Sequence, residues 1–120
     1  MTSIGALAET NYCYLTTTGR RSGRPHRIEI WFVAHDDGAY LLSDTGRSDW
    51  YRNIERNPAV RLEIAGERRD TTARTVDGDD PANATVRPAM VAKYAPTYAD
   101  ADLQDWSRTA FLVRIDWPPV

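Results

Sequence analysis

The fold of this chain is decided by the stretch Tyr12-Cys13-Tyr14-Leu15-Thr16-Thr17-Thr18-Gly19-Arg20-Arg21-Ser22-Gly23-Arg24-Pro25. Its first half, up to Thr18, is a β-branched and aromatic run typical of a strand. Gly19 and Gly23 then bound a short polar segment, after which residues 26–35 form a second strand pattern. Two strand patterns joined by such a segment predict an antiparallel β-hairpin with a loop longer than two residues.

The same reasoning predicts six strands in all. Within residues 26–35 apolar positions alternate with other residues, as expected for one half-buried strand. A turn at Asp36-Asp37-Gly38 leads into the third strand, and the later patterns are alternating or β-branched as well. The predicted strands are residues 12–18, 26–35, 39–43, 60–64, 69–76 and 111–117.

A short helix is predicted over residues 48–56. Ser48 is a plausible N-cap, and Asp49 is favourable in the first turn. Trp50 and Ile54 lie four residues apart and share one face, and the following Asn-Pro pair ends the helix.

A second helix is predicted to start at Asp80-Pro81, which has the signature of a cap followed by an N1 proline. Pro88 should kink this helix or split it in two before Tyr94. Residues 98–106 are compatible with a third short helix.

Strands that follow one another through hairpin-length loops pair antiparallel. Six of them around one core predict a small β-barrel, with the helices covering its openings or filling crossovers. A doubly wound sheet is excluded, because it would need a helix after nearly every strand. We therefore expect a mainly β (α+β) fold with two or three short helices.

Composition bounds the class of protein. The chain has 120 residues, of which 42% are hydrophobic and 27% charged, so we expect one globular domain over residues 1–120. No apolar run is long enough to span a bilayer and no signal sequence is evident, so we expect a cytoplasmic protein. Cys13 is the only cysteine, which excludes an internal disulfide and a cysteine-based metal cluster. His26 and His35 fall on opposite faces of their predicted strand, so no metal site is expected.

Arginine dominates the basic residues. All 15 except Lys93 are arginines, although the net charge of −2 argues against nucleic-acid binding. The hairpin loop combines backbone amides loosened by glycine, the Ser22 hydroxyl and the guanidinium groups of Arg20, Arg21 and Arg24. This combination could hold a phosphate or an oligo-carboxylate. The alternative is a solvated basic hairpin.

A second polar motif lies around the predicted helix 48–56. Arg47 and Asn53 belong to its N-terminal half, where anion binding is favoured. Trp50 pairs with Ile54 at i+4, which indicates a core position for its indole.

Together, in this order and spacing, the two motifs resemble those of the deazaflavin-dependent nitroreductase family of actinobacteria. That family is marked by a Thr-Thr-x-Gly-Arg-Lys/Arg-Ser/Thr-Gly hairpin and a Trp-Tyr-x-Asn-Leu-x-x-Asn-Pro helix. Here residues 16–23 form the first motif, and the second reads Trp50-Tyr51-Arg52-Asn53-Ile54-Glu55-Arg56-Asn57-Pro58. The resemblance runs from about Tyr12 to the last predicted strand.

The resemblance implies a six-stranded antiparallel split β-barrel, similar to FMN-binding proteins. It implies that the chain binds reduced deazaflavin coenzyme F-420 and passes a hydride to a nitroaromatic, a quinone or an activated enone. By position, the coenzyme's acidic tail would be held by Arg20, Arg21, Ser22 and Gly23, with Arg24 nearby. Ser43 and Thr45 would line the deazaflavin ring, Trp50 and Asn53 would support it, and Arg47 is the nearest substitute for a loop lysine of the family.

Tyr94 and Tyr98 match the family's tyrosine-rich segment. Either phenol would hydrogen-bond the acceptor or supply the proton that follows the hydride. The alternative is that both residues pack at a helix end.

Two other functions stay open at this point. The same barrel could use flavin mononucleotide (FMN), because a phosphate site would serve either cofactor, or it could bind a cofactor or ligand without catalysis. We expect a small-molecule electron acceptor as partner, no nucleic acid and no membrane association. The resemblance leaves a homodimer open.

Overall fold

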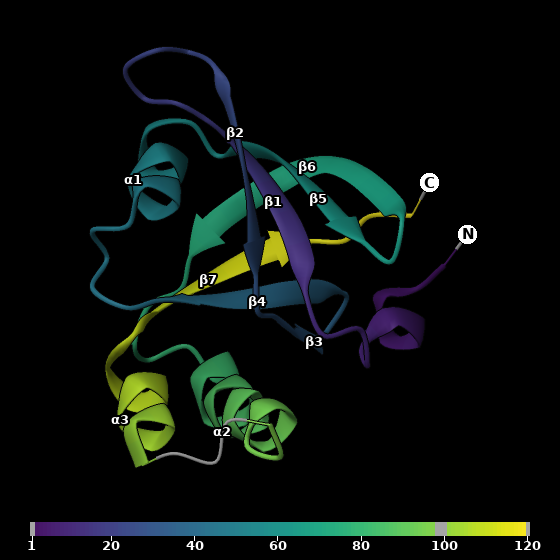
Figure 1. Ribbon diagram of the computed structural model, residues 1–120, viewed down its shortest axis with the longest axis vertical. Coiled ribbons are helices and arrows are strands. Elements are labelled where there is room, and N and C mark those ends of the chain that lie inside the picture. Colours follow the sequence, from purple (N-terminus) through teal and green to yellow (C-terminus); the bar gives the residue numbers. More distant parts are fainter. Residues whose placement is uncertain (1, 98–100, 120) are drawn as a thin grey trace.

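The computed structural model describes residues 2–97 and 101–119, with the backbone alone for residues 101 and 102. The described residues form seven strands in one curled, fully antiparallel sheet, a half-barrel with the order β2-β1-β5-β6-β7-β4-β3 (Figure 1). The strands are β1 (Cys13–Thr18), β2 (Pro25–Ile30), β3 (Val33–His35), β4 (Gly38–Ser43), β5 (Ala59–Ile64), β6 (Glu67–Thr75) and β7 (Phe111–Asp116).

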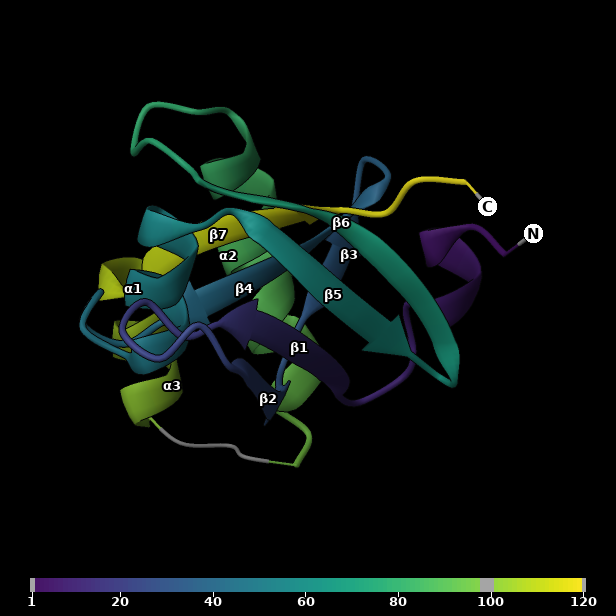
Figure 2. The same ribbon diagram turned by 90° about the horizontal axis from the view of Figure 1, so that it is seen from above.

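Three α-helices and one short 3-10 helix accompany the described sheet. They are η1 (Ile4–Leu7), α1 (Asp49–Arg56), α2 (Ala82–Tyr94) and α3 (Ala101–Thr109). Helix α1 lies beside the β1–β2 hairpin, whereas α2 and α3 pack together on the other side of β4 (Figures 1 and 2). The longest of them, α2, has 13 residues, and none of the described helices has the length and hydropathy needed to cross a bilayer.

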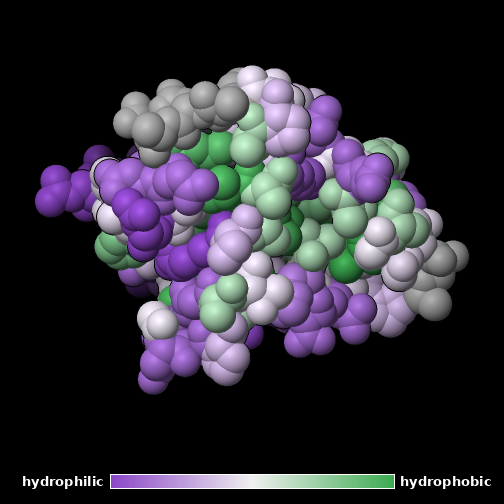
Figure 3. Space-filling model, turned by 90° about the horizontal axis from the view of Figure 1, so that it is seen from below, coloured by the Kyte–Doolittle hydropathy of each residue, from purple (hydrophilic) through white to green (hydrophobic). Residues whose placement is uncertain are grey.

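Two hydrophobic clusters hold this arrangement together. Inside the curl, the inward residues of β1, β4, β5 and β7 pack around Phe32 and against Trp50, Tyr51 and Ile54 of α1. On the outer face of β3, β4 and β7, a second cluster buries α2 and α3. Strand β4 is therefore buried on both faces along its whole length. From the side of α2 and α3, the surface shows a band of hydrophobic residues between hydrophilic margins (Figure 3).

The prediction of a single strand over residues 26–35 is wrong, which is why the described sheet has seven strands and not six. The chain leaves β2 at Ile30 and enters β3 at Val33, and it crosses from one edge of the sheet to the other at Trp31 and Phe32. The Phe32 ring is fully buried in the inner core, and side chains of α2 bind the Phe32 N–H and carbonyl. Apolar alternation continues through this corner, so the pattern did not reveal it.

The first two predicted helices are found as α1 and α2, and the third, predicted over residues 98–106, corresponds to α3 at Ala101–Thr109. Asp80 caps α2, because its Oδ1 accepts the N–H of Ala82 at 2.9 Å. Of the two outcomes expected at Pro88, a kink or a split, the split does not occur, since α2 runs unbroken to Tyr94. Pro88 is exposed, while Val86 and Met90 on the opposite side are fully buried; their packing offsets the missing backbone hydrogen bond.

Candidate functional site

A cleft of 560 Å³ opens between the C-terminal ends of β2 and β4. It lies where the curl of the sheet remains open, because β2 and β3 are the two edges of the described sheet. Its walls come from four segments that are distant in sequence, namely the end of β2, the end of β4 with the loop that follows, the start of α1, and α3. The lining residues are Glu29, Ile30, Trp31, Leu42, Ser43, Asp44, Thr45, Arg47, Ser48, Trp50 and Trp106.

The loop between β4 and α1 shapes one wall of this cleft. Gly46 has a positive φ of +66°, and a Cβ at this position would lie 2.7 Å from two ring carbons of Phe111. Only glycine fits both the left-handed backbone and this close approach. The Ser43 and Ser48 hydroxyl oxygens lie 2.6 Å apart and tie the two ends of the loop together. Ser48 thus begins α1 as predicted, although its hydroxyl bonds to Ser43 and not to the helix backbone.

Four of the predicted site residues meet at the cleft. Ser43, Thr45, Arg47 and Trp50 all line it. Trp50 is also part of the inner core and is 9% exposed. Its side chain therefore takes the core position expected from sequence and also forms part of the cleft wall.

Arg20 and Asn53 form a polar joint between the hairpin and α1. Asn53 is 2% exposed, and its Oδ1 accepts hydrogen bonds from the Arg20 backbone N–H at 3.1 Å and from Arg20 Nη1 at 3.0 Å. Its Nδ2 donates to Thr17 Oγ1 at 3.0 Å. Arg20 Nη2 also pairs with Asp49 at 3.2 Å. These contacts position the hairpin loop against α1. Both terminal nitrogens of the Arg20 guanidinium are bound to α1 residues.

The other arginines predicted for the site carry free charge. Among the residues that the structure describes, the guanidinium groups of Arg21, Arg24 and Arg47 form no hydrogen bond and no ion pair, and all three residues are exposed. Between them, Ser22 Oγ accepts the Arg24 N–H at 3.1 Å and shapes the loop. Gly23 has a φ of +72° and donates its N–H to the Gly19 carbonyl at 2.9 Å. The loop therefore presents two unpaired cations on a fixed backbone, which suits an anionic ligand.

Two further tryptophans form the aromatic end of the cleft, and sequence reasoning placed Trp31 near the site but missed Trp106. Trp31 and Trp106 line it, with ring centroids 5.7 Å apart in an edge-to-face arrangement. The Trp106 indole N–H donates to the Asp44 carboxylate, which anchors α3 at the cleft. Neither tryptophan lies in a recognisable motif, and only the fold brings residues 31, 44 and 106 together.

The structure places Tyr94 behind this wall and not in the cleft. Its ring stacks on Trp31 at 4.2 Å with an interplanar angle of 7°. Its hydroxyl is buried, donates to the Asn11 carbonyl at 2.6 Å and accepts the Phe32 N–H at 3.1 Å. The Tyr94 hydroxyl thus occupies the packing position that the sequence also allowed, and it does not line the cleft. Tyr98 lies outside the described residues.

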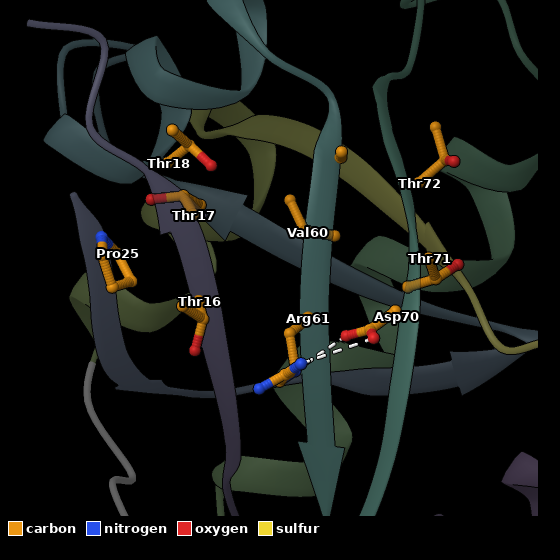
Figure 4. A pocket seen from close by; sticks show the side chains of 10 residues that line it. Thr16, Thr17, Thr18, Pro25, Val60, Arg61, Asp70, Thr71 and Thr72 are labelled. Carbon is orange, nitrogen blue, oxygen red and sulfur yellow. Dashed lines mark hydrogen bonds and ion pairs between the residues drawn. The ribbon is translucent and has the colours of Figure 1, made fainter. Parts of the chain in front are cut away.

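A second hollow of 610 Å³ lies on the outer face of β1, β5 and β6 (Figure 4). It is lined mainly by threonines, and its charged residues Arg61 and Asp70 pair with each other at 2.7 Å. None of the cofactor residues predicted from sequence is among its described lining residues. Nor do the described His, Cys, Asp and Glu side chains form a group that could hold a metal ion.

The chain is similar to known proteins in sequence and in fold. Residues 2–117 match the family model described as F420H(2)-dependent quinone reductase. An F420H(2)-dependent quinone reductase of Mycobacterium tuberculosis (strain ATCC 25618 / H37Rv) is 32% identical over 72 residues, which cover 56% of this chain and 48% of that protein. The chain thus matches about half the length of such curated relatives.

Two solved structures show the same fold. One is an F420-H2 dependent reductase, with a TM-score of 0.66, 23% identity, and coverage of 88% of this chain and 93% of that one. The other is a heme storage protein from Vibrio cholerae, with a TM-score of 0.75, 21% identity, and coverage of 98% and 89%. At these identities the two structures indicate a common fold and nothing further.

Proposed function

The chain belongs to the family of F420H(2)-dependent quinone reductases, and from this premise we propose that it is an oxidoreductase using deazaflavin coenzyme F-420 on a split β-barrel. Its substrate would be a small organic acceptor such as a quinone, a nitroaromatic or an activated enone. The observation that carries the proposal is the convergence of Ser43, Thr45, Arg47 and Trp50 on one cleft.

The residues of the cleft fit the coenzyme's chemistry. Arg21 and Arg24, with Ser22 and Gly23 shaping the loop, would hold an acidic tail by charge-assisted hydrogen bonds. Ser43 and Thr45 offer hydroxyl groups for a polar ring edge, and Trp50 offers an aromatic surface. When bound, the deazaflavin supplies the hydride, and the protein supplies orientation and a dry site.

Arg20 and Asn53 would act on the ligand indirectly, through the position of the hairpin. Their hydrogen bonds fix the hairpin relative to α1, so that the loop arginines stay in register with the cleft. We therefore assign Arg20 and Asn53 as positioning residues for the tail site.

The aromatic end of the cleft would receive the acceptor. Trp31 and Trp106 offer apolar, polarisable surface that excludes water and favours planar molecules. The carboxylates of Glu29 and Asp44 also line the cleft, and they would disfavour an anionic acceptor. We expect neutral acceptors to be preferred over carboxylated ones, while Tyr98 remains a predicted contact to the acceptor.

The proposal is tested by titrating the purified chain with F-420 and, in parallel, with FMN, while the quenching of tryptophan emission is followed. We expect saturable binding of F-420, and oxidation of the bound reduced coenzyme when menadione is added. Tight binding of FMN alone would move the protein to flavin chemistry. Binding of F-420 without turnover of a broad acceptor panel would make it a non-catalytic binding protein.

A homodimer also stays a proposal. One structural neighbour, 21% identical with a TM-score of 0.63, is described as a domain-swapped dimer. Light scattering on the purified chain, with and without F-420, would measure its mass in solution. A mass twice that of the 13.6 kDa chain would support the dimer, and the mass of one chain would exclude it.

A further inference from the structure

The corner between β2 and β3 has an unusual backbone requirement. At Phe32 the chain crosses between the two sheet edges, so this residue cannot use a neighbouring strand for both of its backbone hydrogen bonds. The residue is fully buried, and an unpaired buried N–H or carbonyl is costly. The partners must therefore come from elsewhere in the fold.

Two consecutive residues at the C-terminal end of α2 supply these partners. Lys93 Nζ donates to the Phe32 carbonyl at 2.8 Å, and the Tyr94 hydroxyl accepts the Phe32 N–H at 3.1 Å. The Lys93 ammonium also lies over the Phe32 ring, 3.7 Å from its centroid. Lys93 is the only lysine of the chain, and it is half-buried.

This anchored corner carries one wall of the cleft. Trp31 immediately precedes Phe32, and its ring stacks on Tyr94, so its backbone and its side chain are both tied to α2. A shift at Phe32 would therefore move Trp31, and with it the aromatic end at which Trp106 packs edge-on.

We propose that Lys93 is a positioning residue for the acceptor end of the cleft, holding Trp31 in place through the Phe32 carbonyl and ring. The Lys93–Phe32 contacts are observed in the structure, and only the identity of the ligand at this end rests on the proposed function. Lys93 lines a separate hollow formed by the segment after η1 together with β3 and α2, and it does not line the acceptor cleft.

The groups that surround Lys93 give the proposal a measurable signature. Burial lowers the pKa of Lys93 to about 8, whereas burial raises the pKa of the nearby Cys13 thiol to about 12. Glu9, which lines the same hollow, and Tyr94 are the other titratable groups that face it. Since Cys13 stays protonated around neutral pH, the charge that changes just above neutrality is that of Lys93.

The first test follows the four indole N–H signals of the free chain by NMR, from about pH 6.5 to 9.5. We expect the Trp31 signal to titrate with a midpoint of about 8 in the wild type, and to be displaced and independent of pH in Lys93→Met. Lys93→Arg should keep the wild-type position at neutral pH without the titration. Trp117, whose indole donates to the Thr2 carbonyl in another part of the molecule, is the internal control.

The second test separates positioning from general stability. In Lys93→Met we expect the KM for menadione to rise about fivefold, the scale of one hydrogen bond, with kcat changed less than twofold and F-420 affinity unchanged. Arg68→Met removes an exposed cation of β6 and should leave all three parameters as they are.

An unmoved Trp31 signal in Lys93→Met, or an equal shift of Trp117, would overturn the proposal. If the wild type binds no F-420, the proposed function fails, but the indole titration still decides the role of Lys93.

Discussion

The hairpin site and the aromatic end of the cleft are built in different ways. At the hairpin, Arg20, Asn53 and Thr17 are joined by side-chain hydrogen bonds, and the residues involved belong to two continuous motifs. At the aromatic end, Trp31 and Trp106 come from two separate segments, and α2 holds Trp31 from behind through a backbone contact of Lys93 and the ring of Tyr94. A ligand site encoded in continuous motifs can be recognised in a sequence, whereas one assembled by the fold cannot.

The largest effect is expected from changing Asn53, which joins the hairpin to α1. Asn53→Ala removes three hydrogen bonds and leaves the Arg20 and Thr17 groups without partners, so we expect a loss of about 3 kcal/mol in the free energy of unfolding. Urea denaturation measures this loss. Asn53→Asp keeps the acceptor for Arg20 and can accept from the Thr17 hydroxyl, so it should cost clearly less. Equal losses in the two variants would contradict the role of the joint.

Charge reversal in the hairpin loop should affect binding without affecting folding. Arg21→Glu replaces an exposed, unpaired cation with an anion, so we expect F-420 affinity to fall by about 30-fold to 100-fold. Calorimetric titration gives the affinity, and circular dichroism should show unchanged melting. Arg68→Glu is the matched control on β6. Unchanged F-420 affinity in Arg21→Glu would remove the hairpin from the tail site.

A change at the aromatic end should weaken the use of the acceptor and leave the affinity for F-420 unchanged. Trp106→Leu removes an aromatic wall and the hydrogen bond to Asp44, so we expect the KM for menadione to rise about tenfold. The affinity for F-420 should stay within about twofold of the wild type. A variant that lost F-420 binding and kept the acceptor KM would reverse our assignment of the two ends.

The smallest effect is expected on the outer face of the sheet. The Arg61–Asp70 pair is exposed, and the hydrogen bond from Arg61 lowers the pKa of the Asp70 carboxyl. Arg61→Ala should leave F-420 affinity and acceptor KM unchanged, since exposed ion pairs contribute little. Titrating the Asp70 carboxyl by NMR should show its pKa rising back in this variant. A clear loss of F-420 binding would instead place a ligand in the hollow of Figure 4.

Much of the fold follows from local signals. The hairpin, α1 and the start of α2 depend on glycines, caps and alternation within a few residues, and these were predictable. The corner at Trp31 and Phe32 was not, because its backbone partners on α2 lie about 60 positions further along the chain. The alternating pattern runs on through the corner and hides it.

The same distinction applies to the candidate site. Ser43, Thr45, Arg47 and Trp50 were predicted for the site, and the structure brings them to one cleft. Trp106 and Asp44 could not be paired from sequence, because α3 reaches the cleft only through the packing of α2 and α3 on β4. For Tyr94 the sequence allowed both an acceptor contact and a packing role, and only the structure shows its hydroxyl buried against Asn11 and Phe32, since residue type alone cannot show where a hydroxyl points.

The most direct test of the account is to map F-420 binding onto the four tryptophans by NMR of their indole N–H groups. If the coenzyme occupies the cleft between β2 and β4, the signals of Trp50, Trp31 and Trp106 will shift on titration, while that of Trp117 will stay in place. Arg21→Glu should require far more coenzyme for the same shifts. Binding that moves Trp117 alone, or that leaves the three cleft tryptophans unmoved, would contradict the assignment of this cleft.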